Sequence, residues 1–227
     1  MVDLNCDMGE LEDSAHEAAF MEHITSANIA CGGHAGDEAT MERTVRLALE
    51  RGVRIGAHPG YPDRVNFGRV EIPMSAAEIA AIVSEQIERL DRVVRLLGGT
   101  IVHVKPHGAL YNVAVRNAEV ARAIGAGVAQ WNPAIPIFGL AGASMLEVWR
   151  SMGLTAMGEG FADRRYEPDG TLRNRKFPDA LITNPPEAAA QALRLARSGM
   201  AQTICVHGDT PGAVAILKAC REALGIQ

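Results

Sequence analysis

Short apolar runs alternate with longer amphipathic stretches along almost the whole chain. Short apolar runs are typical of buried strands, whereas apolar residues spaced three and four apart are typical of helices. Strands alternating with helices favour a parallel sheet with helical crossovers. We expect strands at Val2–Asn5, Ser26–Ala30, Val53–Ala57, Thr100–Lys105, Ile135–Leu140, Thr155–Gly158 and Thr203–Val206. We expect helices at Asp37–Arg51, Ser75–Leu97, Ala109–Gln130, Ala143–Met152, Pro186–Arg197 and Pro211–Leu224.

Helix start and stop signals agree with this alternation. Ser75 stands at the N-cap position of the second predicted helix, and Glu78, three residues later, completes a capping box. Gly98 and Gly99 follow its last apolar residue and provide a stop. The segment Phe161–Asp179 has no apolar periodicity, and its length and charge fit either a functional lid or a solvated loop.

Polar residues gather at the end of almost every predicted strand. In a parallel β/α barrel the C-terminal strand ends converge on one face, where active sites lie, whereas an open sheet gathers fewer of them. The sequence therefore favours a closed α/β barrel formed by residues 1–227 as a single domain. The polar clusters are Asn5/Asp7/Glu10, Asn28/His34/Asp37, His58/Asp63/Arg64, Lys105/His107, Glu159/Asp163/Arg164 and His207/Asp209.

Composition and charge exclude several classes of function. The 227 residues carry a net charge of −5 without a Lys/Arg cluster, which argues against a nucleic-acid or membrane partner. No apolar run reaches the roughly 18 residues of a membrane span, and the first residues do not resemble a signal peptide, so we expect a cytoplasmic protein. The four cysteines are scattered without CxxC spacing, which favours buried thiols over disulfides or a zinc ribbon.

The first predicted strand carries an alternating polar face. Asp3, Asn5 and Asp7 are two residues apart, so they share one side of the strand and point into the barrel or at its mouth. The alternative is a strand whose acidic residues merely cap the next helix. We favour a functional role, for Asp7 more than for Asp3.

The segment VKPHGALYN holds a cation and an imidazole at a strand end. Lys105 closes an apolar run, Pro106 restricts the backbone, and His107 stands where a helix is about to begin. The alternative is a lysine that extends from the barrel rim and a histidine that caps the helix. His103, inside the same strand, is assigned to packing.

Three further loops place histidines at strand ends. His34 follows two glycines that permit close backbone approach, but the chain lacks GxGxxG and Walker-type motifs, so phosphate binding there is not favoured. His58 is followed by a proline-containing loop with Asp63 and Arg64, and we expect its ring to face the barrel mouth. His207 repeats the strand–His–Gly pattern, and it fits either a site residue or a capped turn.

The motifs together resemble a known family. DLNCDMGE, SANIACGGHAGDE, IGAHPGYPDRVNFGR, HVKPHGALYN, EGFADRRY and VHGDTPGAV are similar, in this order and spacing, to motifs of the LamB/YcsF family. That family includes the A-type component of the bacterial ATP-dependent 5-oxoprolinase. Two features depart from its usual pattern: the segment between Arg197 and Thr203 is short, and Gly33 stands where relatives often carry phenylalanine.

The resemblance implies a seven-stranded barrel of the glycoside hydrolase/deacetylase type. It implies opening of the lactam of 5-oxo-L-proline to L-glutamate with ATP hydrolysis, in complex with B- and C-type subunits. ATP and magnesium would be held by this chain or by one of those partners. A homo-oligomer of the chain is also compatible with the resemblance.

This chemistry requires a base for water, cations for anionic groups and donors for developing oxyanion charge. We expect Asp7, Lys105 and His107 to be catalytic. A divalent metal held by Asp7, His58 and His107, the arrangement of the superfamily deacetylases, is a further expectation, with a hydrogen-bonding His58 as its alternative. We expect the substrate-binding residues to be Asn28, His34, His58, Asp63, Arg64, Glu159, Asp163, Arg164 and His207.

Two other functions fit the same barrel. One is a metal-dependent deacetylase or amidohydrolase that needs no ATP. The other is a non-catalytic subunit that holds a small acid and regulates a partner.

Overall fold

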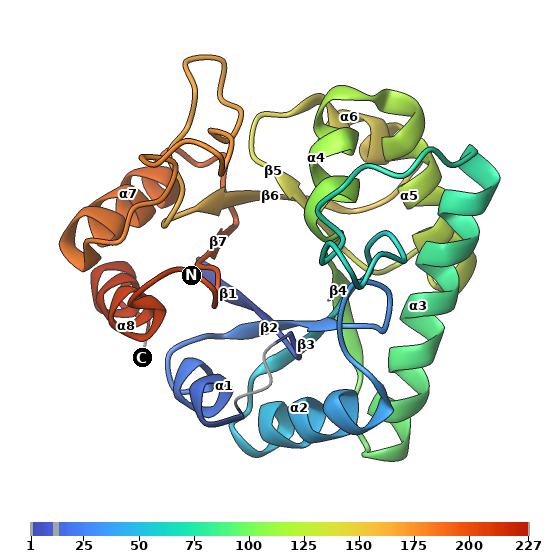
Figure 1. The fold of residues 1–227 in the computed structure, drawn as a ribbon, viewed down its shortest axis with the longest axis horizontal. Helices are drawn as coiled ribbons and strands as arrows, with labels where there is room; N and C mark the ends of the chain where they lie inside the picture. Colours follow the sequence, from blue (N-terminus) through green and yellow to red (C-terminus); the bar gives the residue numbers. More distant parts are fainter. Residues whose placement is uncertain (1, 11–13, 227) are drawn as a thin grey trace.

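Seven parallel strands form a closed barrel surrounded by helices (Figure 1). The computed structural model describes residues 2–10 and 14–226. The strands follow one another around the barrel in chain order, and β7 closes it against β1. They are β1 (Asp3–Met8), β2 (Ser26–Ala30), β3 (Arg54–His58), β4 (Ile101–Val104), β5 (Ile137–Leu140), β6 (Ala156–Phe161) and β7 (Thr203–Cys205). The α/β barrel predicted from the sequence, with seven strands, is confirmed.

Eight helices cover the outside of the barrel in the described residues (Figure 1). Their apolar faces pack on the strands and supply most of the core, as in α3, where Ile79, Val83, Ile87 and Leu90 are buried. Among the described residues, no helix has both the length and the apolar character needed to cross a membrane. The helices are α1 (Ser14–Met21), α2 (Glu38–Glu50), α3 (Ala76–Leu96), α4 (Gly108–Arg116), α5 (Ala118–Trp131), α6 (Ser144–Ser151), α7 (Pro185–Arg197) and α8 (Ala213–Leu224).

The observed elements differ from the predicted ones in two places. Helix α1 was not predicted, because its eight residues are too few to show a clear apolar period. The single helix predicted at Ala109–Gln130 is two helices, because Asn117 turns its side chain onto the amides of Glu119 and Val120 and starts α5 anew. The capping box of Ser75 and Glu78 is present as predicted.

The inside of the barrel is lined by polar side chains rather than by the usual branched apolar ones. Asp3 accepts hydrogen bonds from Ser26 (2.7 Å) and Thr203 (2.5 Å) at the N-terminal end of the barrel. One level higher, Asn5 donates to Thr203 (2.6 Å) and accepts from Asn28 (2.8 Å). The alternating face predicted for the first strand is therefore an interior column that leads up to Asp7.

His103 completes the middle of this column. Its ring stacks on Phe138 with centroids 4.2 Å apart, and its Nε2 donates to Asn28 Oδ1 at 2.8 Å. A methyl group at Gly56 would overlap the imidazole, so the glycine leaves the space that the ring fills. The structure thus places His103 in the packed interior, the role that the sequence suggested. Burial lowers the pKa of His103 to about 3.

We predict that His103 makes the protein less stable in mild acid. Below its ordinary pKa of 6.5 the unfolded chain binds a proton that the folded ring does not bind, so the unfolding free energy falls as the pH decreases. The slope from one such group is about 1.4 kcal/mol per pH unit. Urea denaturation of wild type and His103→Gln at pH 4 to 6 should give a shallower slope for the variant. An exposed-site variant, His16→Gln, should keep the wild-type slope, and equal slopes for all three proteins would refute the prediction.

Candidate functional site

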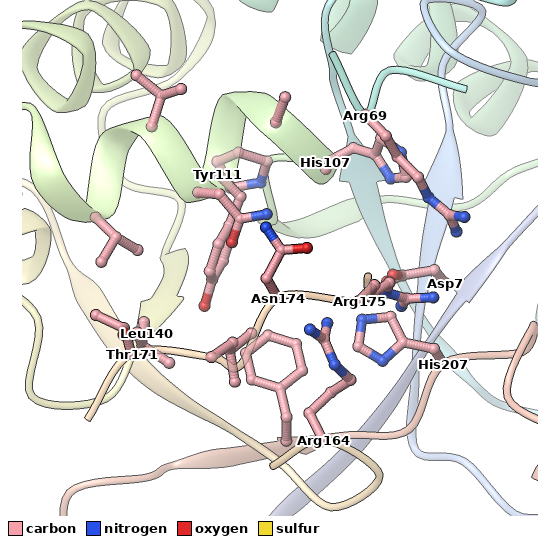
Figure 2. Close-up of a pocket in the computed structure, with 18 of the residues that line it drawn as sticks. Asp7, Arg69, His107, Tyr111, Leu140, Arg164, Thr171, Asn174, Arg175 and His207 are labelled. Atoms are coloured by element: carbon pink, nitrogen blue, oxygen red, sulfur yellow. The ribbon is translucent and has the colours of Figure 1, made fainter. Parts of the chain in front are cut away.

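A cavity of about 760 Å³ opens at the C-terminal ends of the strands (Figure 2). Its floor contains Asp7, Lys105 and His58, and α4 contributes one wall through Tyr111. The loop between β6 and α7 contributes the opposite wall through residues 171–176. In Figure 2 Asn174 projects into the space between Tyr111, Arg164 and His207. Part of the segment predicted to be a lid or a solvated loop therefore lines the cavity.

The centre of the floor is a buried lysine. Lys105 follows β4, is 2% exposed, and its ammonium lies 2.7 Å from Asp7 Oδ1 and 3.0 Å from Glu159 Oε1. Its third neighbour is the Cys205 thiol at 3.1 Å. Burial alone would lower the pKa of Lys105, but Asp7, Cys205 and Glu159 outweigh that effect and raise it well above its ordinary value.

Asp7 is held as an anion by the same contacts. Burial would raise the pKa of its carboxyl, but His58 and Lys105 hold that pKa well below its ordinary value. Lys105 and Asn28 both donate to Oδ1, at 2.7 and 2.9 Å, which leaves Oδ2 facing His58 Nε2 at 3.4 Å. The Asp7, Cys205 and His207 ligand atoms also lie close enough to hold a metal, but the Lys105 ammonium occupies the space beside the first two.

A second cluster beside the lysine contains three histidines and one carboxylate: His34, His58, His107 and Glu10. One ligand atom of each lies within 4.8 Å of those of the others. The Glu10 Oε1 atom is 2.8 Å from His34 Nε2, 3.3 Å from His107 Nδ1 and 3.6 Å from His58 Nε2. The rings of His34 and His107 stack at 3.5 Å, which fixes both planes.

Backbone carbonyls set the tautomers in this cluster. His58 Nδ1 lies 2.7 Å from the Lys105 carbonyl, and His107 Nε2 lies 2.9 Å from the Phe67 carbonyl. A carbonyl only accepts, so each of these nitrogens carries a proton. The remaining nitrogens, His58 Nε2 and His107 Nδ1, face each other at 2.9 Å, so a proton or a cation lies between them. Burial would lower the pKa of His58, but Asp7 and Glu10 raise it above its ordinary value. Two ring nitrogens and a carboxylate oxygen converge, an arrangement that holds a shared proton or a bound cation.

Neighbouring loops fix the position of the cluster. The Gly9 amide before Glu10 donates to the buried Glu17 at 2.6 Å, so α1 anchors the chain there. Phe67, whose carbonyl meets His107, has a left-handed φ of 54°, a conformation that is strained for a residue with a side chain. Its ring packs edge-on against His34 at 5.5 Å and supplies an aromatic neighbour where Gly33 has none.

The opposite side of the mouth holds a carboxylate–imidazole pair, Asp163 and His207. Asp163 is fully buried and lies 3.0 Å from His207 Nδ1 through Oδ2. The His207 ring stacks on Phe161 with centroids 5.3 Å apart. His207 itself lines the cavity, whereas Asp163 lies behind it.

Arginines from several loops border the opening. Arg164 is 6% exposed, donates to the Arg173 carbonyl at 2.7 Å, and has no carboxylate within ion-pair distance in the described part of the chain. Burial and the nearby Arg175 lower the pKa of Arg164 to about 10, still high enough for a full positive charge at neutral pH. Asp209 joins Arg69 (2.5 Å) to Arg175 (2.8 Å), which ties three loops together over the cavity.

The sequence profile of the LamB/YcsF family matches residues 2–227, which is nearly the whole chain. This chain belongs to the LamB/YcsF family. The LamB/YcsF resemblance read from the motifs is therefore confirmed.

Relatives and solved structures agree with this membership. Proteins named as the A subunit of 5-oxoprolinase, from Chloroflexus aggregans and Methylococcus capsulatus, are 47% and 45% identical to it over 98% of this chain and 94% and 92% of their own length. A lactam utilization protein from Thermus thermophilus superposes with a TM-score of 0.91 at 40% identity, covering 99% of this chain and 96% of that one. A peptidoglycan N-acetylglucosamine deacetylase domain from Eubacterium rectale covers 99% and 85% with a TM-score of 0.53 at 10% identity, and it shares the fold alone.

Relatives within the LamB/YcsF family carry positions that this chain lacks. The Chloroflexus aggregans relative aligns over 238 positions, more than the 227 residues of this chain. In the structure the short segment 198–202 joins α7 directly to β7. That this is where the positions are missing stays a prediction.

The predicted site residues of this LamB/YcsF protein divide into three groups. Those lining the cavity are Asp7, His58, Lys105, His107, Arg164 and His207. Those buried behind it, in contact with the first group, are Asn28, His34, Glu159 and Asp163. Asp63 and Arg64 do not line it: Asp63 accepts from the Asn66 amide (3.0 Å) of its own loop, and Arg64 donates to the Gly36 carbonyl (2.7 Å) beside a separate surface cavity.

Several cavity residues were not predicted from the sequence. Glu10, and not Asp7, completes the cluster with His58 and His107, and His34 joins it. Glu10 stood in the polar group after the first strand, but nothing in the sequence distinguished it from Asp7. Other unpredicted residues that line the cavity are Arg69, Tyr111, Asn174 and Arg175.

We predict that Lys105→Met strongly destabilises the fold. The substitution keeps the approximate length of the side chain but leaves Asp7 and Glu159 buried without their cation, which typically costs about 3–5 kcal/mol. The exposed Lys218 offers a matched control, and Lys218→Met should change the unfolding free energy by less than about 0.5 kcal/mol. Urea unfolding at neutral pH measures both, and a similar small effect for the two variants would contradict the assigned role.

Proposed function

We propose that this protein is the A subunit of an ATP-dependent 5-oxoprolinase that opens the lactam of 5-oxo-L-proline to L-glutamate with B- and C-type subunits. The observation that carries the proposal is the cavity in which Asp7–Lys105, the histidine cluster and an unpaired Arg164 meet in the described part of the chain. The names of the relatives, 41–47% identical over 98% of this chain, support it. The use of ATP by the proposed 5-oxoprolinase fits a cytoplasmic protein.

The charges of the cavity suit a small cyclic acid. 5-Oxoproline carries one carboxylate, and Arg164 is a buried cation without an ion-pair partner among the described residues. A guanidinium binds a carboxylate through two parallel hydrogen bonds, which orients as well as attracts it. Lys105 is already paired with Asp7 and Glu159, so we assign it to holding Asp7 rather than to binding the carboxylate.

An unstrained lactam resists water because resonance makes its carbonyl a poor electrophile. Phosphorylation of the lactam oxygen by ATP would give a carbon that water attacks more readily and a better leaving group. The Oδ2 of Asp7, which Lys105 and Asn28 leave unengaged, would orient this water and take up its proton. The chain lacks GxGxxG and Walker-type motifs, so ATP and its magnesium are assigned to a partner subunit.

The histidine cluster fits a divalent metal ion. Three imidazoles and one carboxylate are ligands that Zn²⁺ and other first-row ions prefer, and His58 and His107 turn towards Glu10 the ring nitrogens that do not donate to backbone carbonyls. Glu10, His34, His58 and His107 would hold the ion. When bound, it would polarise a carbonyl or lower the pKa of a water molecule.

We predict that Zn²⁺ binds the metal-free protein at one ion per chain. Glu10→Gln and His58→Gln should each weaken the affinity at least tenfold, because each removes a ligand. His23→Gln, in the connection between α1 and β2, should leave the affinity for Zn²⁺ unchanged. Isothermal titration and elemental analysis provide the measurement, and equal affinities for all variants would remove the cluster as the binding site.

We predict that glutamate forms from 5-oxo-L-proline only when this chain, its B- and C-type partners and ATP are combined. Asp7→Asn should lower kcat by about 100-fold or more, since it removes a charge that orients water and pairs with Lys105. Asp63→Asn, outside the cavity, is the matched control and should retain wild-type turnover. Circular dichroism shows whether each variant is folded.

The same assay separates the other candidate functions. Hydrolysis of an amide or acetyl group by the isolated chain with metal and without ATP would favour a deacetylase-type amidohydrolase, the function suggested by the metal-ligating cluster. Full turnover by the complex containing folded Asp7→Asn would favour a non-catalytic binding subunit.

A further inference from the structure

We propose that His207 is the acid that protonates the leaving nitrogen of the lactam, with Asp163 as its positioning residue. The proposal rests on the proposed function and deepens it, because it assigns the second proton transfer of ring opening. Its basis is the arrangement of Asp163 and His207 across the cavity from the histidine cluster.

Asp163 is held in one orientation by three donors. Its Oδ2 accepts hydrogen bonds from the backbone amide of His207 (3.0 Å), from Thr210 Oγ1 (2.5 Å) and from His207 Nδ1 (3.0 Å). The residue is fully buried just beyond the end of β6. Burial would raise the pKa of Asp163, but His207 and the hydrogen bonds hold it below its ordinary value, so it stays an anion.

The orientation of Asp163 determines what His207 presents to the cavity. A carboxylate only accepts, so His207 Nδ1 carries the proton and Nε2 is directed away from Asp163. Stacking on Phe161 holds the plane of the ring. His207 lines the cavity, and one of its ligand atoms lies within 4.8 Å of Asp7 and Cys205.

The histidines of the opposite cluster do not offer a free nitrogen for this task. Both ring nitrogens of His58 and of His107 make contacts, to backbone carbonyls and to each other. His34 lies behind His107 and does not line the cavity. His207 Nε2 makes no hydrogen bond to another described residue, and the buried Asp163 carboxylate behind Nδ1 fixes the orientation of the ring.

Ring opening with His207 as the acid is balanced in protons and electrons. Water adds its oxygen to the phosphorylated lactam carbon and loses one proton to the Asp7 side of the cavity. The carbon–nitrogen bond then breaks, its electron pair goes to nitrogen, and the added oxygen loses its second proton to solvent and forms a carbonyl. The acyl phosphate that is left is hydrolysed by a second water to the glutamate carboxylate and inorganic phosphate. The imidazolium of His207 gives the Nε2 proton to that nitrogen, which leaves as an amine, and the neutral His207 regains a proton from solvent. Without this proton, nitrogen would leave as an unstable amide anion.

The first test reads the tautomer of His207 and is independent of turnover. In the NMR spectrum of ¹⁵N-histidine-labelled full-length protein, we expect neutral His207 to carry its proton on Nδ1. The His207 signal is assigned by its absence from the spectrum of His207→Gln. Asp163→Asn keeps the shape but can donate to Nδ1, and it should move the proton to Nε2. The same tautomer in wild type and Asp163→Asn would overturn the positioning role.

The second test reads the proton transfer in the reconstituted complex. His207→Gln and Asp163→Asn should each lower kcat about 100-fold or more with KM changed less than about threefold, and the double variant should be little worse than either. His207→Ala should regain activity with added imidazole, which a merely structural residue would not allow. His16→Gln is the control and should behave as wild type.

The kinetics of His207→Gln separate the acid role from the alternatives. A raised KM with unchanged kcat would make His207 a substrate-binding residue and overturn its role as the acid. If wild type and folded His207→Gln are equally active, the acid role of His207 is overturned but the proposed 5-oxoprolinase function stands. Wild type that forms no glutamate in any mixture would overturn the proposed function and, with it, the acid role.

Discussion

The buried ammonium of Lys105 is the constraint on which the rest of the mouth depends. A charge that is 2% exposed is stable only with partners, and the partners come from two other strands of the barrel: Asp7 from β1 and Glu159 from β6. The carbonyl of the same residue accepts from His58 and selects its tautomer. Lys105 therefore links the ion pairs with β1 and β6 to the histidine cluster.

The polar column below Lys105 explains how a barrel can hold such a site. Asp3, Asn5 and Asn28 are satisfied by neighbours on adjacent strands, so the interior carries few unpaired groups below the mouth in the described part of the chain. Buried atoms without a hydrogen-bond partner among the described residues lie higher, at Arg164 Nε and at the Glu159 oxygen that does not face Lys105. Unsatisfied buried polarity thus concentrates near the cavity, where a ligand can supply the missing partners.

The sequence predicted the parts of this arrangement that follow from strand period and topology. The period of two placed Asp3, Asn5 and Asp7 on one face, and the barrel rule brought Lys105 and His207 to one end. The choice of Glu10 over Asp7 for the histidine cluster was not predictable, because it depends on the long-range contact between the Gly9 amide and Glu17. Arg64 was misplaced because the loop after β3 turns it outwards onto Gly36.

The two sides of the cavity have complementary acid–base character, and Asp7–Lys105 separates them. On the β3–β4 side, ring nitrogens of His58 and His107 converge with Glu10, a set suited to holding a shared proton or a cation. On the β7 side, Asp163 holds the Nδ1–H of His207 and turns Nε2 away from itself, a set suited to delivering a proton. Opening a lactam needs a proton removed from water and another delivered to nitrogen. Lys105 holds Asp7 as an anion between the histidine cluster and His207. The two sides of the cavity therefore stay separate, and a single cavity can serve both proton transfers.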